Sequence, residues 1–400
     1  MKSPSEAFLN DRPYDSYEEY LGELSVLLNL KIQAYLKENK GDYCEEKPVL
    51  LVLSGKLNRA GITGEQDVEA WEERIEDRLE MTKLAGDYFA LEYVVSKMGM
   101  DGFGRMVLAL ALLASLDYTY RGVFQYLNED EKKSHPTLEL CGRIFREPGQ
   151  SVFDMYNQIY GRIRDYRILF PGINVENQYM TRELVCDERL LDILLGKNRC
   201  IPAEIEIIEG QGKDPLWFRE TEMQALESFV EDKKFPIFLI LGERGAGKKQ
   251  LVRYFAQNQG MELVLFDGSV YDRMEEEGYE RLTKALQYAV RECVLWTMPL
   301  AIQGIDGFEQ NLTERFLIYL KDELQGILQL IFVLSCMEKY SPETGGIYVL
   351  PLGRMNEQQR IQLWNHYREG YLLEENISIE ELANTFSLTP GQIKEALQQA

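Results

Sequence analysis

A glycine-rich stretch that ends in two lysines is the part of the sequence whose residue types point most directly to chemistry. It reads Gly242-Glu243-Arg244-Gly245-Ala246-Gly247-Lys248-Lys249. The spacing is G-x-x-x-x-G-K, and the stretch lies between an apolar run at residues 237–241 and a segment with helical spacing at 250–259. In a strand–loop–helix layout, glycine backbone N–H groups can surround a phosphate, and the lysine reaches the terminal phosphates. This pattern indicates a P-loop that binds ATP or ADP.

The residue after Lys248 departs from the pattern. A serine or threonine hydroxyl normally binds Mg²⁺ there, but Lys249 carries an ammonium group, which has no acceptor. We therefore assign no metal ligand and leave a requirement for Mg²⁺ open. The candidate nucleotide-binding residues are Gly242, Glu243, Arg244, Gly245, Ala246, Gly247, Lys248, Lys249 and Gln250.

Hydrolysis of ATP also needs a carboxylate for Mg²⁺ and a glutamate base at the end of a neighbouring strand. The apolar run at 299–302 is followed instead by Gln303 and Gly304. Asp306 and Glu309 lie just beyond and are weak catalytic candidates. A shift of register would bring Asp306 near the site, but the favoured interpretation is that Asp306 begins the loop after the strand.

The remaining positions of a hydrolytic site are also altered. The third strand leads into Ser335 and Cys336, where an asparagine or threonine usually contacts the attacking water or the γ-phosphate. Lys394 takes the place of the usual arginine in the last helices. Residues 341–346, where an arginine finger is expected, contain no arginine, and the nearest one, Arg354, is assigned to a strand end. We expect these degenerate Walker motifs to hydrolyse ATP very slowly or not at all.

Alternating strands and helices surround the glycine-rich stretch. Strands are expected at 237–241, 262–266, 299–302, 328–334 and 347–350, and helices at 217–231, 250–259, 278–294 and 311–324. Such alternation predicts a parallel sheet covered by helices on both faces. Helices at 356–369, 378–386 and 389–400 then predict a small helical lid, which is the build of an AAA+ module.

The first 196 residues read as mostly helical. Helices are expected at 14–39, 63–84, 89–98, 101–116, 123–127, 135–144, 153–163 and 187–195. Thr63 and Gln66 match a capping box, and the helix at 101–116 is apolar almost all round, which is typical of a domain centre. The apolar run at 47–53 is expected to be a short strand. Extended pieces at 168–171 and 183–186 suit a winged-helix arrangement.

The predicted fold class is therefore α/β. Residues 1–196 form a helical domain with winged-helix character, and residues 197–214 form a linker. Residues 215–353 form a P-loop α/β domain of AAA+ type, and residues 354–400 form the helical lid.

Composition excludes several classes of protein. The chain has 400 residues and a net charge of −22, so we do not expect nucleic acid as a partner. Six scattered cysteines without a CxxC pair suit free thiols in a reducing, cytoplasmic location, and two histidines far apart argue against a Cys/His metal site. The longest apolar run, residues 106–116, is too short to span a membrane.

Several segments carry a family resemblance that covers most of residues 10–400. They include Phe103-Gly104-Arg105-Met106, His135-Pro136-Thr137-Leu138, Asp187-Glu188-Arg189 and Leu388-Thr389-Pro390-Gly391-Gln392-Ile393. The chain resembles the N-terminal half of large bacterial two-module AAA-family ATPases, often encoded beside phage-tail-like contractile injection systems. The resemblance implies a degenerate first module used for structure or regulation, with hydrolysis in a second module beyond Ala400.

We therefore expect an ATP-binding protein whose degenerate module acts in ring assembly or regulation, and whose N-terminal domain recruits a protein partner. One alternative is an active ATPase that uses Asp306 or Glu309. Another is a winged-helix DNA-binding regulator with a nucleotide switch, against which the acidic charge counts.

Overall fold

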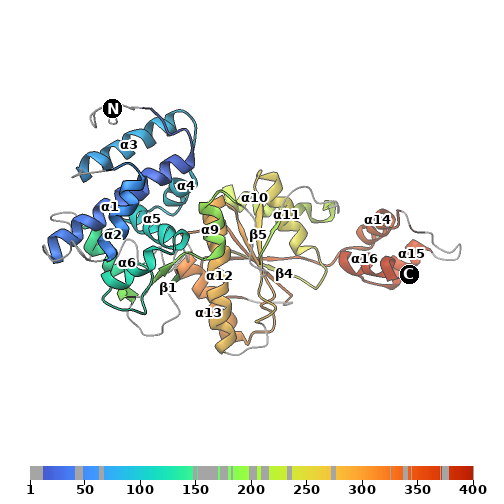
Figure 1. Cartoon of the computed structure of the whole chain (residues 1–400). Coiled ribbons are helices and arrows are strands. Elements are labelled where there is room, and N and C mark those ends of the chain that lie inside the picture. Colours follow the sequence, from blue (N-terminus) through green and yellow to red (C-terminus); the bar gives the residue numbers. More distant parts are fainter. Residues whose placement is uncertain are drawn as a thin grey trace. The chain divides into compact units, whose positions relative to one another are not determined.

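The computed structural model describes residues 12–40, 48–62, 67–146, 151, 170–171, 179–181, 183–197, 205–208, 216–231, 237–271, 276–324, 326–336, 341–343, 345–369, 371 and 378–399. The chain divides into two compact units, Met1–Cys200 and Ile201–Ala400, each with its own internal contacts (Figure 1). We call them the N-terminal unit and the C-terminal unit.

The N-terminal unit is built mainly from helices. They are α1 (Tyr17–Lys40), α2 (Pro48–Arg59), α3 (Val68–Leu84), α4 (Ala90–Lys97), α5 (Gly102–Leu116), α6 (Tyr120–Leu127), α7 (Leu138–Phe145) and α9 (Glu188–Leu194). Helix α5 is buried at every residue from 103 to 112, as its apolar sequence predicts, and contacts α1, α4, α6 and α7. It is the centre of this unit.

One local prediction for this unit was wrong. Residues 47–53 do not form a strand, because the buried positions Val49, Leu53 and Leu57 follow helical spacing and Leu51 is 66% exposed. The cap of α3 is Asp67, whose carboxylate accepts hydrogen bonds from the amides of Glu69 and Ala70 at 3.0 and 3.3 Å. The predicted cap at 63–66 lies outside the described residues.

A short antiparallel ribbon accompanies the helices. Strand β1 (Phe170–Pro171) pairs with β2 (Leu184–Val185), and Thr137 forms an isolated bridge with Glu183. A single 3₁₀ turn, η3 (Tyr179–Thr181), contacts α7. The extended segments predicted near 168–171 and 183–186 therefore meet each other, while the predicted helix at 153–163 lies outside the described residues.

The C-terminal unit contains a six-stranded sheet in the order β3-β5-β6-β7-β4-β8. The strands are β3 (Ile205–Ile208), β4 (Ile237–Leu241), β5 (Leu263–Asp267), β6 (Leu300–Gln303), β7 (Ile331–Ser335) and β8 (Ile347–Pro351). All pairs are parallel except β3 with β5. Strand β3 lies inside the segment expected to be a linker, because Ile205 and Ile208 are buried against the sheet.

Helices cover both faces of this sheet, as the alternation predicted. They are α10 (Glu220–Glu231, entered by η4, Trp217–Arg219), α11 (Lys248–Asn258), α12 (Glu276–Trp296) and α13 (Gln310–Tyr319, extended by the π turn η5, Leu320–Leu324). Helices α10 and α11 share a core with alternate strand residues such as Phe238 and Phe332. Helices α12 and α13 lie on the other side (Figure 1).

Three helices complete the chain: α14 (Glu357–Tyr367), α15 (Ile379–Thr385) and α16 (Pro390–Gln399). Asn356 and Gln359 form a capping box at the start of α14. The three helices enclose a small core that includes Leu363, Trp364 and Ile393, and Phe218 from η4 joins it. We call these helices the lid.

Candidate functional site

The connection from β4 to α11 is the glycine-rich loop, residues 242–248. Gly245 and Gly247 have φ of 79° and 93°, a left-handed conformation that L side chains rarely adopt, and Gly247 is the N-cap of α11. The loop therefore places the amino end of an eleven-residue helix beside a buried strand. Backbone N–H groups and the helix dipole favour an anion at such an end.

Lys248 curls back over this loop. Its Nζ donates to the carbonyl oxygens of Gly242 and Glu243 at 2.6 and 3.0 Å, and contacts the Sγ of Cys336 at 3.5 Å. The ammonium group thus lies between the loop and the end of β7. Its partners are two neutral carbonyl oxygens and a thiol, which an anionic phosphate oxygen could replace.

The carboxyl ends of four parallel strands meet beside the loop. Gln303, at the end of β6, donates its Nε2 to Oδ2 of Asp267, at the end of β5, at 2.9 Å. Asp306 accepts at Oδ1 from the hydroxyl of Ser335 at 2.6 Å and from the amide of Cys336 at 2.7 Å. Asp306 therefore lies in the loop that follows β6, as the favoured interpretation predicted, but its carboxylate reaches the end of β7 and lines the same cleft as Lys248.

Two of these groups have shifted pKa values. Burial alone would raise the pKa of Asp267, but hydrogen bonds from Ser269 and Gln303 and the charge of Lys249 outweigh it and lower that pKa. Burial raises the pKa of the Cys336 thiol, with Asp306 acting in the same direction and Lys248 in the opposite one. At neutral pH Asp267 is an anion and Cys336 is protonated.

An open cleft of about 720 Å³ lies over the loop. This volume is in the range that holds small-molecule ligands. Its charged lining residues are Arg244, Lys248, Lys249, Arg253, Lys394, Asp267 and Asp306. The cleft thus combines the glycine-rich loop, the strand ends and one lid helix. Glu309, by contrast, lies at the start of α13 and is not among the described lining residues.

The lid touches the loop directly. The hydroxyl of Thr389 donates to the carbonyl of Arg244 at 3.1 Å, and the amide of Gly391 donates to the carbonyl of Gly245 at 3.0 Å. Lys394, one turn later on α16, lines the cleft and lies 5.7 Å from the ring centre of Tyr367. The loop is therefore held from one side by the sheet and from the other by the lid.

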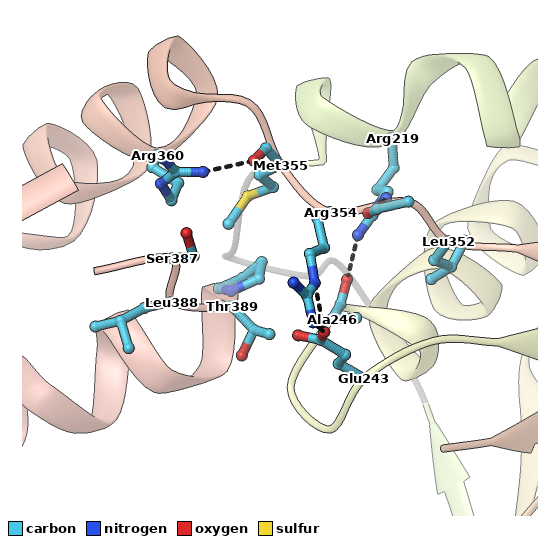
Figure 2. Close-up of a pocket in the computed structure, with 12 residues that line it drawn as sticks. Arg219, Glu243, Ala246, Leu352, Arg354, Met355, Arg360, Ser387, Leu388 and Thr389 are labelled. Atoms are coloured by element: carbon cyan, nitrogen blue, oxygen red, sulfur yellow. Dashed lines mark hydrogen bonds and ion pairs between the residues drawn. The ribbon is translucent and has the colours of Figure 1, made fainter. Parts of the chain in front are cut away.

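Figure 2 shows a second, smaller pocket between the loop, the end of β8 and the lid. Arg219 is almost fully buried there and donates to the carbonyl oxygens of Gly353 and Ala246 at 2.8 and 3.1 Å. Arg354 reaches from the end of β8 to the carboxylate of Glu243 (Nε to Oε1, 2.6 Å). With about 50 Å³, the pocket holds no more than a few water molecules.

The structure brings together residues that the sequence suggested separately. The loop, Asp306, Cys336 and Lys394 line one cleft, and the buried Ser335 is hydrogen-bonded to Asp306. Sequence reasoning did not single out Asp267, Arg253 or Arg219. Asp267 could have been found as the last residue of its strand, since the carboxyl ends of parallel strands share an edge.

Comparison with known families concerns the first half of the chain. The family model described as "Winged helix domain, variant" matches residues 2–203. The chain belongs to this winged-helix family. The match agrees with the helices and the short β1–β2 ribbon of the N-terminal unit, and it confirms the winged-helix interpretation of the sequence. No curated protein matches the chain.

The matched residues of the winged-helix family end before the glycine-rich loop. In the part of the chain that the structure describes, no helix is both long and apolar enough to cross a membrane.

Proposed function

We propose that the C-terminal unit of this winged-helix protein is a degenerate AAA+ module that binds ATP or ADP and hydrolyses it slowly or not at all. The observation that carries the proposal is the glycine-rich loop at the amino end of α11, with Lys248 beside it and a basic cleft above. Backbone amides, a helix dipole and several ammonium and guanidinium groups together favour a polyphosphate.

The arrangement of strands supports the same proposal. Strand β4 lies inside the sheet between β7 and β8. The next strand along the chain, β5, lies three positions away from β4 in the sheet. In open α/β sheets, ligands bind outside the carboxyl ends of strands, near points where consecutive strands diverge.

Weak hydrolysis is inferred from the groups beside the phosphate position. Lys249 offers no oxygen for a metal, Gln303 is hydrogen-bonded to Asp267, and Gly304 has no side chain to act as a base. The Cys336 thiol is protonated, and its Sγ accepts a hydrogen bond from the Nζ of Lys248. We further propose that the module serves ring assembly or regulation of a larger cytoplasmic ATPase, and that the winged-helix unit recruits its protein partner, in line with the resemblance to ATPases of contractile injection systems.

The binding half of the proposal is tested by titrating ATP and ADP into the protein and following the heat released. Lys248→Ala should weaken binding about tenfold or more, because a charge-assisted hydrogen bond to phosphate is lost. Lys284→Ala, an exposed lysine on α12, is the matched control and should bind like the wild type. Absence of binding by the wild type, or equal binding by Lys248→Ala, would refute it.

One observation favours a second candidate, an active ATPase. Asp306 lines the cleft and uses Oδ1 for its two hydrogen bonds from Ser335 and Cys336. A turnover on the order of one per second, abolished by both Lys248→Ala and Asp306→Asn, would establish this alternative in place of the degenerate module.

A further inference from the structure

The cleft over the glycine-rich loop carries an excess of positive charge, although the chain as a whole has a net charge of −22. Five basic side chains line it, against the two carboxylates Asp267 and Asp306. A polyphosphate in the cleft would therefore meet more basic than acidic side chains.

The two carboxylates are poorly placed to hold a divalent metal. Both oxygens of Asp267 accept hydrogen bonds, from the Ser269 amide at 3.0 Å and from Gln303 at 2.9 Å. Asp306 accepts two at Oδ1, so of its two oxygens only Oδ2 is left as a candidate metal ligand. Mg²⁺ needs a near-octahedral set of oxygens, usually with a carboxylate and the phosphates among them. Within the described ranges, no three Asp, Glu, His or Cys side chains gather into such a group. The residues do not fit the Mg²⁺ that the P-loop resemblance implies.

Lys249 occupies the position where that metal's hydroxyl ligand would stand. It is the second residue of α11 and lines the cleft. Its Nζ donates to Oε2 of Glu206, on strand β3, at 2.7 Å. The side chains are 44% and 59% exposed, so this ion pair contributes little and exchanges readily with other anions. Its charge also helps to lower the pKa of Asp267, which lines the same cleft.

We propose that this site binds a nucleoside di- or triphosphate without a divalent cation, with the Lys249 ammonium supplying the positive charge that Mg²⁺ would otherwise bring. The inference rests on the proposed nucleotide site and specifies the form of its ligand. On binding, Lys249 exchanges the Glu206 carboxylate for a phosphate oxygen. A ligand held in this way is retained rather than consumed, since no metal polarises its terminal phosphate.

The test is calorimetric titration of ATP into the full chain, once with EDTA and once with excess Mg²⁺. Affinity in EDTA should equal or exceed the affinity in Mg²⁺. Binding that is more than about tenfold tighter with Mg²⁺ overturns this inference and leaves the nucleotide site in place. No binding of ATP or ADP in either condition refutes the site itself, and the inference with it.

Substitutions at Lys249 and Glu206 sharpen the test. Lys249→Thr restores a hydroxyl, so affinity in EDTA should fall about tenfold while Mg²⁺ should now strengthen binding. Glu206→Gln removes the negative charge that pairs with Lys249, so the affinity for ATP in EDTA should be unchanged or higher. Lys284→Thr is the matched control, and thermal melting checks that each variant is folded. Unchanged affinity of Lys249→Thr in EDTA, or weaker binding by Glu206→Gln, would contradict the role of Lys249.

Discussion

Two independent features disfavour any residue other than glycine at position 245. Its φ of 79° is strained for an L residue, and a Cβ there would lie 2.6 Å from the hydroxyl oxygen of Thr389. We expect Gly245→Ala to destabilise the C-terminal unit by about 1–3 kcal/mol, the sum of the backbone strain and the steric conflict with the lid. Urea unfolding of the variant measures this change.

Gly260 provides a matched control for the backbone contribution. It has a φ of 67°, but a Cβ there meets nothing within 4 Å. Gly260→Ala should therefore show the strain without the conflict and cost less than Gly245→Ala. If the two variants lose the same free energy of unfolding, the lid accommodates the added methyl group at position 245 without loss of stability.

Cys336 offers a chemical probe of the cleft. Because burial and Asp306 raise its pKa, the thiolate is scarce at neutral pH, and its reaction with a disulfide reagent should accelerate as the pH rises above the usual thiol range. A bound polyphosphate that draws Lys248 away from the Sγ should slow the reaction. The measurement is the rate against pH, with and without ATP; a rate that ATP does not change would contradict a ligand position over Lys248.

At this scale, the sequence located the loop because its glycines and lysine form a contiguous motif. It could not reveal the pair of Lys249 with Glu206, which are 43 residues apart and were expected in different segments. Nor could it show that Asp306 turns back to the amide of Cys336, since that depends on the path of the chain after β6. Motifs are local, whereas hydrogen bonds between strand ends are not.

Among the elements, helix α2 shows where an apolar run misleads. A strand would place Leu51 and Leu53 on one face, whereas the helix places them on different faces. Leu53 is fully buried and Leu51 is 66% exposed. We expect Leu53→Ala to lower the free energy of unfolding by about 2–5 kcal/mol and Leu51→Ala to change it by less than about 0.5 kcal/mol.

Chemical denaturation of the two variants distinguishes the interpretations, because a strand with one buried face would make both leucines costly or both neutral. The alternating strands and helices of the C-terminal unit were predicted more faithfully, since the central strands β4, β5, β6 and β7 are buried on both faces and bounded by turns. Strand β3 was missed because four residues between glycine-rich and polar segments carry too weak a pattern.

For the whole molecule, charge is distributed unevenly. A chain of net charge −22 repels polyanions at long range, yet its cleft over the glycine-rich loop is basic. Screening limits the long-range effect to about 10 Å at ordinary ionic strength, so a small phosphate ligand is governed by the local groups. An extended nucleic acid would meet the acidic surface over a much larger area, which disfavours it as a partner.

Strand β3 has a practical consequence for producing the C-terminal unit alone. A fragment cut at residue 215, where the sequence alone would divide the chain, loses β3 and exposes the backbone edge of β5. Uncovered edges pair with other copies, so we expect this fragment to aggregate during size-exclusion chromatography, whereas a fragment beginning at residue 201 should elute as a discrete species. Similar elution of both fragments would show that the β5 edge tolerates exposure. If only the longer fragment elutes as a discrete species, the four residues of β3 decide whether the unit can be purified.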